Sequence, residues 1–330
     1  MSVLISTESD ADMIAVPGGK FAMGSDHFYP EEAPVRRVRV DPFRIEATPV
    51  TNAQFAAFVA ATGHVTSAEI APDPKDYPGM DPALAQPGSA VFEMTDRPVD
   101  TCVPTWWHFR PGASWRAPTG PGSSIDGIED HPVVHVAYTD AEAYAAWAGK
   151  ALPTETEWEF AARGGLDGAD FAWGEDLAPA GAMLANYWQG LFPFANQLTD
   201  GYLRTSPVRT FPPNGYGIHD MIGNVWEWTT DWFAQRSVDR KAKGACCVPE
   251  NPRGGTRDGS IDKREPTSVP RKVIKGGSHL CAENYCQRYR PAARYAQPID
   301  TSTGHIGFRC VIRFRQQRLT RSAGGSRGER

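Results

Sequence analysis

The sequence predicts a single loop-rich α+β domain with little regular secondary structure, and three observations support this prediction. The chain has 330 residues, enough to bury a substantial core. It contains 32 Gly and 28 Pro, well above average usage, together with 10 Trp and 10 Tyr. This composition favours long connections held by aromatic side chains over a helical bundle. We expect the domain to cover residues 1–315 and a basic, Gly/Ser-rich, disordered tail to follow over 316–330.

The composition also excludes several kinds of partner. The net charge is -5, so the chain offers no basic surface for nucleic acid, and an anionic membrane is an equally poor partner. No stretch reaches the ~18 apolar residues of a membrane-spanning helix. The N-terminus lacks the basic and apolar regions of a secretory signal. We therefore expect a cytoplasmic protein whose six cysteines stay mostly reduced.

Two strand signals lie near the N-terminus. Residues 13–25 favour two short strands joined as a hairpin around Pro17-Gly18-Gly19. Residues 35–46 alternate apolar and polar side chains around a break at Asp41-Pro42. The alternation predicts that one face of this stretch is buried, with Val38, Val40, Phe43 and Ile45 pointing inward.

Three helices follow from capping signals. The first starts at Thr51, which forms a capping box with Gln54, carries Phe55, Phe58 and Val59 as its apolar stripe, and ends at Gly63. The second begins near Asp140 and ends at Gly149. The third starts at Thr154, with Glu157 completing another capping box, and ends at Gly164.

The remaining segments are mostly irregular. Residues 66–130 show no periodicity, and three tryptophans favour an ordered excursion packed on the core over a disordered linker: Trp106, Trp107 and Trp115. After the third helix we expect mostly loop until a strand over 272–277. Residues 305–314 alternate as one final strand, with Ile306, Phe308, Cys310, Ile312 and Phe314 inward and Arg309 on a partly solvated face.

The strongest chemical signal is a pair of cysteines, Cys281 and Cys286, in the segment 275–294 (KGGSHLCAENYCQRYRPAAR). Four residues separate them, which does not fit the C-x-x-C knuckle of structural zinc. Two thiolates suit a soft ion of low coordination number, and Cu(I) is the obvious choice. The spacing alone leaves three alternatives open: two unrelated core thiols, a structural disulfide, or a redox dithiol.

This segment resembles the active-site stretch of the formylglycine-generating enzymes, the sulfatase-modifying factors, in its bacterial form. Further matches run in order along nearly the whole chain: GKALPTETEWEFAARGG, ANYWQG, FPPNGYGIHDMIGNVWEWTTDW and GHIGFRC. GNVWEW and GFR are shared with non-catalytic relatives, whereas the C-x4-C after GGS marks the catalytic branch. The resemblance implies the formylglycine-generating, C-type-lectin-like fold.

The resemblance also implies an activity. Cys281 and Cys286 would bind Cu(I), and an unfolded sulfatase or other protein would present a Cys-x-Pro-x-Arg segment whose thiolate becomes a third ligand. Reaction with O2 then removes hydrogen from the substrate Cβ, and hydrolysis of the thioaldehyde leaves Cα-formylglycine. No G-x-G-x-x-G follows a strand, so no flavin or nicotinamide fingerprint competes. A metal-free mechanism, in which Cys286 forms a sulfenic acid, is the second choice.

Other site residues are matched position by position. Ser278 corresponds to the family's active-site serine, and Tyr285 to the tyrosine near bound oxygen. Arg290 and Arg294 lie where the family has arginines near the site, although buried salt bridges explain them about equally well. We expect His279 to be a packing residue.

Two structural calcium ions are implied as well, where spacing alone would favour turns and caps. The first set comprises side chains of Asn186 and Asp200 and carbonyls of Tyr187 and Tyr202. The second comprises side chains of Asp220 and Glu227 and carbonyls of Gly223 and Val225. We interpret Trp226, Trp228 and Trp232 as core residues, one of which could line the oxygen pocket.

The sequence departs from the animal enzymes in its cysteines. Positions that carry disulfide cysteines there are Ala145, Ala162 and Pro291 here, which leaves Cys310 as a core thiol. Cys246 and Cys247 are expected to be free thiols or to share one external partner. A non-catalytic binding module on the same fold remains the main alternative. A related iron-dependent sulfoxide synthase is disfavoured because no H-x3-H-x-E cluster is present.

Overall fold

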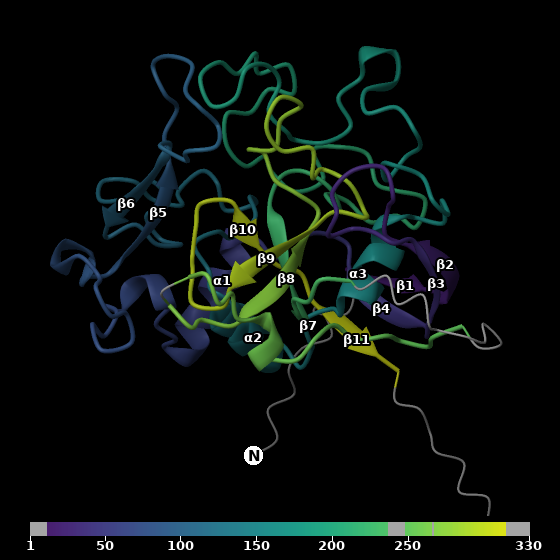
Figure 1. The fold of residues 1–330 in the computed structure, drawn as a ribbon, viewed down its shortest axis with the longest axis horizontal. Coiled ribbons are helices and arrows are strands. Elements are labelled where there is room, and N and C mark those ends of the chain that lie inside the picture. The colour runs from purple at the N-terminus through teal and green to yellow at the C-terminus, as the bar shows by residue number, and fades with distance from the viewer. Residues whose placement is uncertain (1–11, 237–247, 266, 315–330) are drawn as a thin grey trace, which may run out of the picture.

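A computed structural model describes residues 12–236, 248–265 and 267–314. Within these ranges the chain forms three α-helices and four small β-sheets joined by long loops (Figure 1). The predicted α+β fold with little regular structure is therefore confirmed. Cys246, Cys247 and the predicted tail over 316–330 lie outside the described residues. In the described part of the chain, no helix is both long enough and apolar enough to cross a membrane.

The central sheet has the strand order β10-β7-β8-β9. It consists of β7 (Trp226–Trp232), β8 (Arg271–Lys275), β9 (Arg294–Pro298) and β10 (Ile306–Gly307), and only β10 runs parallel to its neighbour. The sequence predicted β8 but not β7, which was expected to be loop. Most of β7 is buried on both faces, so its sequence shows no alternation of apolar and polar residues.

A second sheet pairs β4 (Phe43–Glu46) with β1 (Met13–Val16) on one side and β11 (Val311–Arg313) on the other. A separate ribbon pairs β2 (Gly19–Met23) with β3 (Arg36–Val40). The predicted hairpin between β1 and β2 is therefore wrong, although both strands exist. The predicted break at Asp41-Pro42 is confirmed, because it separates β3 from β4.

Gly18 lies between β1 and β2, where the two strands diverge to different partners. Its φ is +68°, and a Cβ at this position would meet the carbonyl oxygen of Val40 at 2.6 Å. The turn at Gly18 thus packs tightly against the junction between β3 and β4, and each early strand pairs with one of those two strands. The four residues predicted to face inward here are all buried: Val38, Val40, Phe43 and Ile45.

The C-terminal stretch 305–314 forms two strands in different sheets, not the single strand that alternation predicted. Residues 308–310 connect β10 to β11. Arg309, expected on a partly solvated face, is fully buried and forms a forked ion pair with Glu227. Phe314, expected inward, is 55% exposed. A buried guanidinium needs a buried carboxylate as its partner. Because this partner, Glu227, lies on β7, residues 308–310 stay next to the central sheet before the chain enters β11.

The first and third helices begin and end as their capping signals predicted. α1 (Asn52–Thr62) and α3 (Glu155–Ala162) both start with complete capping boxes, at Thr51 and Thr154. Gly63 closes α1 in the left-handed conformation, with φ of 69°. These local signals therefore sufficed for both helices.

The second helix, α2 (Tyr138–Trp147), begins two residues before the expected position. Asp140 lies inside its first turn, and its carboxylate accepts a hydrogen bond from the backbone N–H of Ala137 at 2.9 Å. Asp140 therefore caps the helix from within the first turn instead of preceding it.

Aromatic side chains fill the core between the helices and the central sheet. Phe55 and Phe58 of α1 pack on Tyr144 of α2, and Tyr144 packs on Phe308. As predicted, Trp226 and Trp228 are buried. Trp232 is only partly buried and lies under the ammonium group of Lys272.

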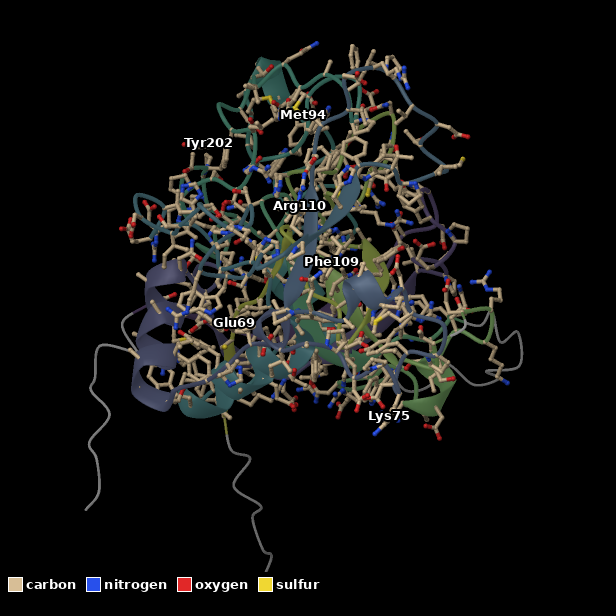
Figure 2. All side chains as sticks on the ribbon, turned by 90° about the vertical axis from the view of Figure 1, so that its left-hand side faces the viewer. Glu69, Lys75, Met94, Phe109, Arg110 and Tyr202 are labelled. Carbon is tan, nitrogen blue, oxygen red and sulfur yellow. The ribbon has the colours of Figure 1, made fainter. Side chains whose placement is uncertain are left out.

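The excursion over residues 66–130 is ordered, as predicted. It contains the ribbon of β5 (Gly88–Phe92) and β6 (Trp107–Pro111). Trp106 and Trp115 are buried and Trp107 is partly buried. Its residues, with Glu69, Lys75, Phe109 and Arg110 labelled, spread over one face of the molecule (Figure 2).

Short 3-10 helices lie at Ser67–Glu69, Pro82–Leu84, Pro179–Gly181 and Asp258–Ser260.

Candidate active site

The loop between β8 and β9, residues 276–293, carries the cysteine pair. It leaves the sheet through Gly276 and Gly277, both with positive φ. A Cβ on Gly277 would meet the carbonyl oxygen of Arg288 at 2.7 Å, so the start of the loop packs closely against the residue two positions after Cys286. This close approach brings together the two sides of the segment that holds both cysteines.

Cys281 and Cys286 lie together at the centre of this loop. The backbone N–H of Cys286 donates to the carbonyl of Ala282 at 2.8 Å, which makes a single helical turn. This turn brings the two Sγ atoms to 3.2 Å, where they share a hydrogen bond. Both thiols are free and buried. The separation is well beyond the ~2.05 Å of a disulfide bond, so the structure presents a pair of thiols facing each other.

The electrostatic surroundings favour one negative charge on this pair. The hydrogen bond from Cys281, and after it the positive charge of Arg288, lowers the pKa of Cys286 to about 6. Burial raises the pKa of Cys281 well above its usual value. The Nη1 atom of Arg288 lies 3.8 Å from Cys286 Sγ. The hydrogen bond and the nearby guanidinium therefore favour a thiolate at Cys286 that accepts a hydrogen bond from the thiol of Cys281.

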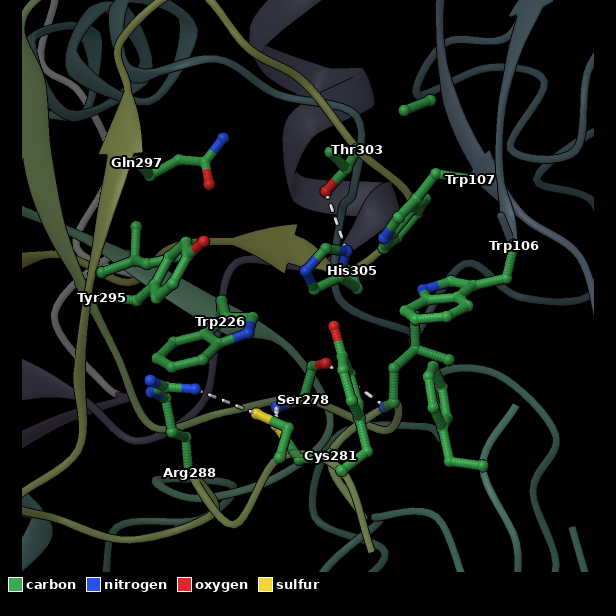
Figure 3. A pocket seen from close by; sticks show the side chains of 16 residues that line it. Trp106, Trp107, Trp226, Ser278, Cys281, Arg288, Tyr295, Gln297, Thr303 and His305 are labelled. Carbon is green, nitrogen blue, oxygen red and sulfur yellow. Dashed lines mark hydrogen bonds between the residues drawn. The ribbon is translucent and has the colours of Figure 1, made fainter. Parts of the chain in front are cut away.

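The pair opens into a cavity of about 340 Å³ (Figure 3). Indole rings of Trp106, Trp107 and Trp226 contribute much of its apolar wall. Of the three tryptophans considered from the sequence, Trp226 is the one that lines this cavity. Polar groups enter from the cysteine loop, from β9 and from the segment before β10, including Ser278, Gln297 and His305. An apolar cleft with a few convergent polar groups is typical of a substrate site.

Ser278 and Tyr285 both line the cavity, as the sequence interpretation requires. The Ser278 amide points at Cys281 Sγ, 3.5 Å away, and its hydroxyl accepts from the amide of Leu280 at 3.2 Å. The Tyr285 ring stacks on Phe192 with centroids 4.5 Å apart. Burial raises the pKa of Tyr285, so its hydroxyl keeps its proton near neutral pH.

Arg290 and Arg294 do not line the cavity. Arg290 donates to both oxygens of Glu32, and Arg294 donates to both oxygens of Glu155, all in buried surroundings. The geometry thus favours the salt-bridge interpretation for both. His279 is buried and bonded through Nδ1 to the carbonyl of Asn224 at 2.8 Å, and burial lowers its pKa to about 4. It packs as a neutral imidazole, as expected.

The cavity residues that sequence reasoning missed include Arg288 and His305. Arg288 follows Cys286 by two positions, and its guanidinium faces the sulfur. His305 lies beside Trp107, with ring centroids 4.7 Å apart, and its Nδ1 is 2.9 Å from the hydroxyl of Thr303. The only sequence signal for Arg288 was its closeness to the second cysteine. His305 stands directly before the IGFR segment, yet only the return of the chain to β7 brings it to the cavity.

The cysteine pair fits a copper(I) ion. Two sulfurs converge on the edge of a cavity, and thiolates are the donors that Cu(I) prefers. Among the described residues, no group of three or more His, Cys, Asp or Glu side chains gathers to hold a metal ion. A site of protein side chains here would therefore rest on two sulfurs and leave positions open toward the cavity.

The first expected calcium set also fits a cation. The Oδ1 atom of Asn186 is buried and has no hydrogen-bond partner in the described structure. The carbonyl of Tyr187 and Oδ2 of Asp200 converge on a single donor, Nε2 of Gln189. The backbone N–H of Tyr202 donates to Asp200 Oδ1 at 3.0 Å. Two oxygens that converge on one donor, and an unpaired buried oxygen on the residue next to Tyr187, are the kind of group that a hard cation binds.

The second expected set is more fully occupied by protein groups. Glu227 pairs with Arg309 and accepts from the indole of Trp158 at 2.7 Å. Asp220 accepts from the backbone of Arg209. Burial raises the pKa of both Asp220 and Glu227. The Arg309 guanidinium pairs with the Glu227 carboxylate and donates to the backbone carbonyl of Asp220. A cation at Gly223 and Val225 is therefore compatible with the charge, but the protein groups need it less than those of the first set.

Comparison of the sequence with known proteins identifies the family. Residues 4–314 match the sulfatase-modifying factor enzyme 1-like domain. The formylglycine-generating enzyme of Mycobacterium tuberculosis is 52% identical over 302 residues, which cover 91% of this chain and 97% of that protein. A mouse (Mus musculus) relative at 38% identity, covering 92% and 86% of the two chains, is named inactive C-alpha-formylglycine-generating enzyme 2.

A solved structure supports the fold. The structure of PvdO from Pseudomonas aeruginosa superposes with a TM-score of 0.58 at 24% identity, covering 92% of this chain and 94% of that one. This likeness concerns the fold alone. The names of the relatives include both an enzyme and an inactive protein, so the choice between them for this chain depends on the residues of the cavity.

Proposed function

This chain belongs to the formylglycine-generating enzyme (sulfatase-modifying factor) family, and we propose that it oxidises the cysteine of a Cys-x-Pro-x-Arg segment in sulfatases to Cα-formylglycine with O2 and Cu(I). The observation that carries this proposal is the facing pair of thiols, 3.2 Å apart, at an aromatic cavity. The inactive relative shows that the family includes non-catalytic members, and the thiol pair favours the catalytic alternative.

The stoichiometry of the reaction shows what a metal would contribute. Conversion of –CH2–SH to –CH=S removes two electrons and two protons, and their transfer to one O2 gives one H2O2. Hydrolysis of the thioaldehyde then exchanges sulfur for oxygen and releases H2S. Cu(I), held by Cys281 and Cys286, would supply the one-electron chemistry with O2 that the side chains of the cavity lack.

The chain's own residues bind and orient the substrate. The indole rings of Trp106, Trp107 and Trp226 exclude water from the reacting carbon and give an extended peptide an apolar surface. Ser278, three positions before Cys281, offers its hydroxyl to the substrate sulfur or to reduced oxygen. Tyr285 keeps its proton and can donate it at the mouth of the cavity, where 38% of the residue is exposed.

The two calcium ions are proposed as structural elements. Asn186, Asp200 and Asp220 lie in the long loop between α3 and β7, and Glu227 lies on β7. Hard oxygen ligands drawn from such loops would fix them without added secondary structure. The unpaired Oδ1 of Asn186 is the observation that supports the first ion most directly.

The test is turnover of a peptide. Copper-loaded full-length protein, incubated in air with a Cys-x-Pro-x-Arg peptide, should give the mass change for replacing sulfur and two hydrogens with one oxygen. The same peptide with Ser in place of Cys should stay unchanged. Unchanged thiol peptide after copper loading would rule out the activity, and equal conversion by metal-free protein in a copper chelator would favour the thiol-only mechanism instead.

A further inference from the structure

A segment near the N-terminus packs against the cysteine loop and forms hydrogen bonds and ion pairs with it. Residues 28–32, which we call the strap, lie between β2 and β3 and contact residues 287–290. The hydroxyl of Tyr29 accepts from the backbone N–H of Gln287 at 3.0 Å. Glu31 and Glu32 pair with successive arginines of the loop, Arg288 and Arg290. The strap therefore fixes the half of the loop that begins just after Cys286.

The strap holds the Arg288 guanidinium in one orientation. Its Nε and Nη2 atoms both donate to Oε1 of Glu31, at 3.2 and 2.6 Å. Its flat face lies over the ring of Tyr29, with 3.7 Å between the guanidinium carbon and the ring centroid. With one edge and one face engaged, the remaining nitrogen, Nη1, points at Cys286 Sγ, 3.8 Å away (Figure 3).

Charge makes this orientation significant. A Cu(I) ion held by two thiolates carries a net charge of -1, and a bound substrate thiolate would make it more negative. Much of the cavity wall is aromatic or aliphatic, so this charge is poorly solvated. Among the described residues that line the cavity, Arg288 is the one Lys or Arg, and the strap keeps it beside the sulfur.

We propose that Arg288 compensates the negative charge of the copper-thiolate centre, with Glu31 and Tyr29 as the residues that position it. This inference rests on the proposed function. Arg290 provides the structural contrast. It is anchored by the strap in the same way, through Glu32, but it pairs inside the protein and does not line the cavity. Two neighbouring arginines thus have different tasks, one toward the metal and one toward the fold.

The experiment is an anaerobic competition for Cu(I) between the full-length protein and a chromogenic chelator. Arg288→Gln keeps an N–H donor for Glu31 but removes the charge, and we expect Cu(I) affinity to fall roughly ten- to a hundredfold. Arg288→Lys restores the charge and should recover most of this loss. Arg264→Gln removes the same charge from a surface pair with Asp262 and should bind as wild type does.

The outcomes separate this inference from the proposed function. Thermal melting identifies the variants that fold. If Arg288 had a purely structural role, both substitutions would lower the melting temperature but leave the Cu(I) affinity equal to that of the wild type. Equal affinity of folded Arg288→Gln and wild type overturns the inference alone. If Arg288→Gln does not fold, Glu31→Gln takes its place, because it releases the guanidinium without removing it. Weaker Cu(I) binding by folded Glu31→Gln supports the inference, and binding equal to wild type overturns it. A wild-type protein that binds no Cu(I) overturns both proposals.

Discussion

Two sets of buried cysteines in this molecule differ in what surrounds them. Cys281 and Cys286 face each other at the edge of a cavity, beside an arginine. Cys310 is at least as deeply buried, but it lies in the core between β10 and β11. Its backbone N–H donates to Glu46, whose other oxygen is paired with Lys150. Burial and then Glu46 raise the pKa of Cys310, so it stays a thiol.

The comparison teaches that burial alone does not identify a functional thiol. Cys310 belongs to the hydrophobic core, beside the ion pair of Glu46 and Lys150, and does not line the cavity. The other two cysteines have an open side and a nearby positive charge. The imidazoles repeat this contrast, because both nitrogens of His135 are bonded in the core whereas His305 borders the cavity. A buried thiol or imidazole that lines a cavity is therefore a better candidate for a catalytic or metal-binding role than one enclosed in the core.

The largest expected effect tests the contrast between the thiols directly. Cys281→Ala or Cys286→Ala should abolish conversion of the peptide and Cu(I) binding in the competition assay, because one sulfur cannot hold the ion in a stable site. Cys310→Ala is the matched control and should retain both. The comparison breaks if Cys310→Ala loses copper, or if either single variant of the pair still converts peptide.

Calcium removal tests whether the unpaired Oδ1 of Asn186 belongs to a cation site. An ion that binds only the folded protein stabilises it by about 4 kcal/mol at a thousand times its dissociation constant. A calcium chelator should therefore lower the melting temperature, and added calcium should restore it. Asn186→Ala should weaken this response. Identical melting in chelator and in excess calcium would contradict both proposed sites.

Acid should destabilise the protein through His135, the fully bonded imidazole. Burial lowers its pKa to about 4 from a usual 6.5. The neutral form is therefore favoured in the folded state, and this stability is complete above pH 6.5 and is lost as the pH falls toward 4. At 1.36 kcal/mol for each pKa unit, the loss approaches about 3 kcal/mol.

Denaturant unfolding at several pH values measures this loss. His135→Asn tolerates the positive φ of 59° at this position and should flatten the decline between pH 6.5 and 4. Parallel pH profiles for the wild type and the variant would mean that His135 carries none of the acid sensitivity.

The smallest effect concerns the core thiol itself. Cys310→Ala removes one buried sulfur and leaves a small cavity, so the free energy of unfolding should fall by about 1–2 kcal/mol. Equilibrium unfolding in urea gives this value. A loss above about 4 kcal/mol would show that the sulfur does more than fill space, and would weaken the distinction between the two sets of cysteines.

Much of the fold and site could be predicted because the signals were local. The capping boxes at Thr51 and Thr154 lie within one helical turn, and both proved correct. The cavity residues of the segment 275–294 could be named from a contiguous resemblance. Arg288 was missed because its partner, Glu31, is 257 residues away in the chain, and no local pattern links them.

The sequence by itself determined the family, the limits of α1 and α3, and the closeness of Cys281 to Cys286, since one turn of backbone suffices to join residues five apart. Only the tertiary structure decided that 305–314 divides between two sheets, that Arg309 is buried against Glu227, and that the strap aims Arg288 at a sulfur. The physical reason is the range of the interactions. Caps and turns are set by neighbouring residues, whereas strand partners and buried ion pairs are chosen by whichever distant groups the whole core brings together.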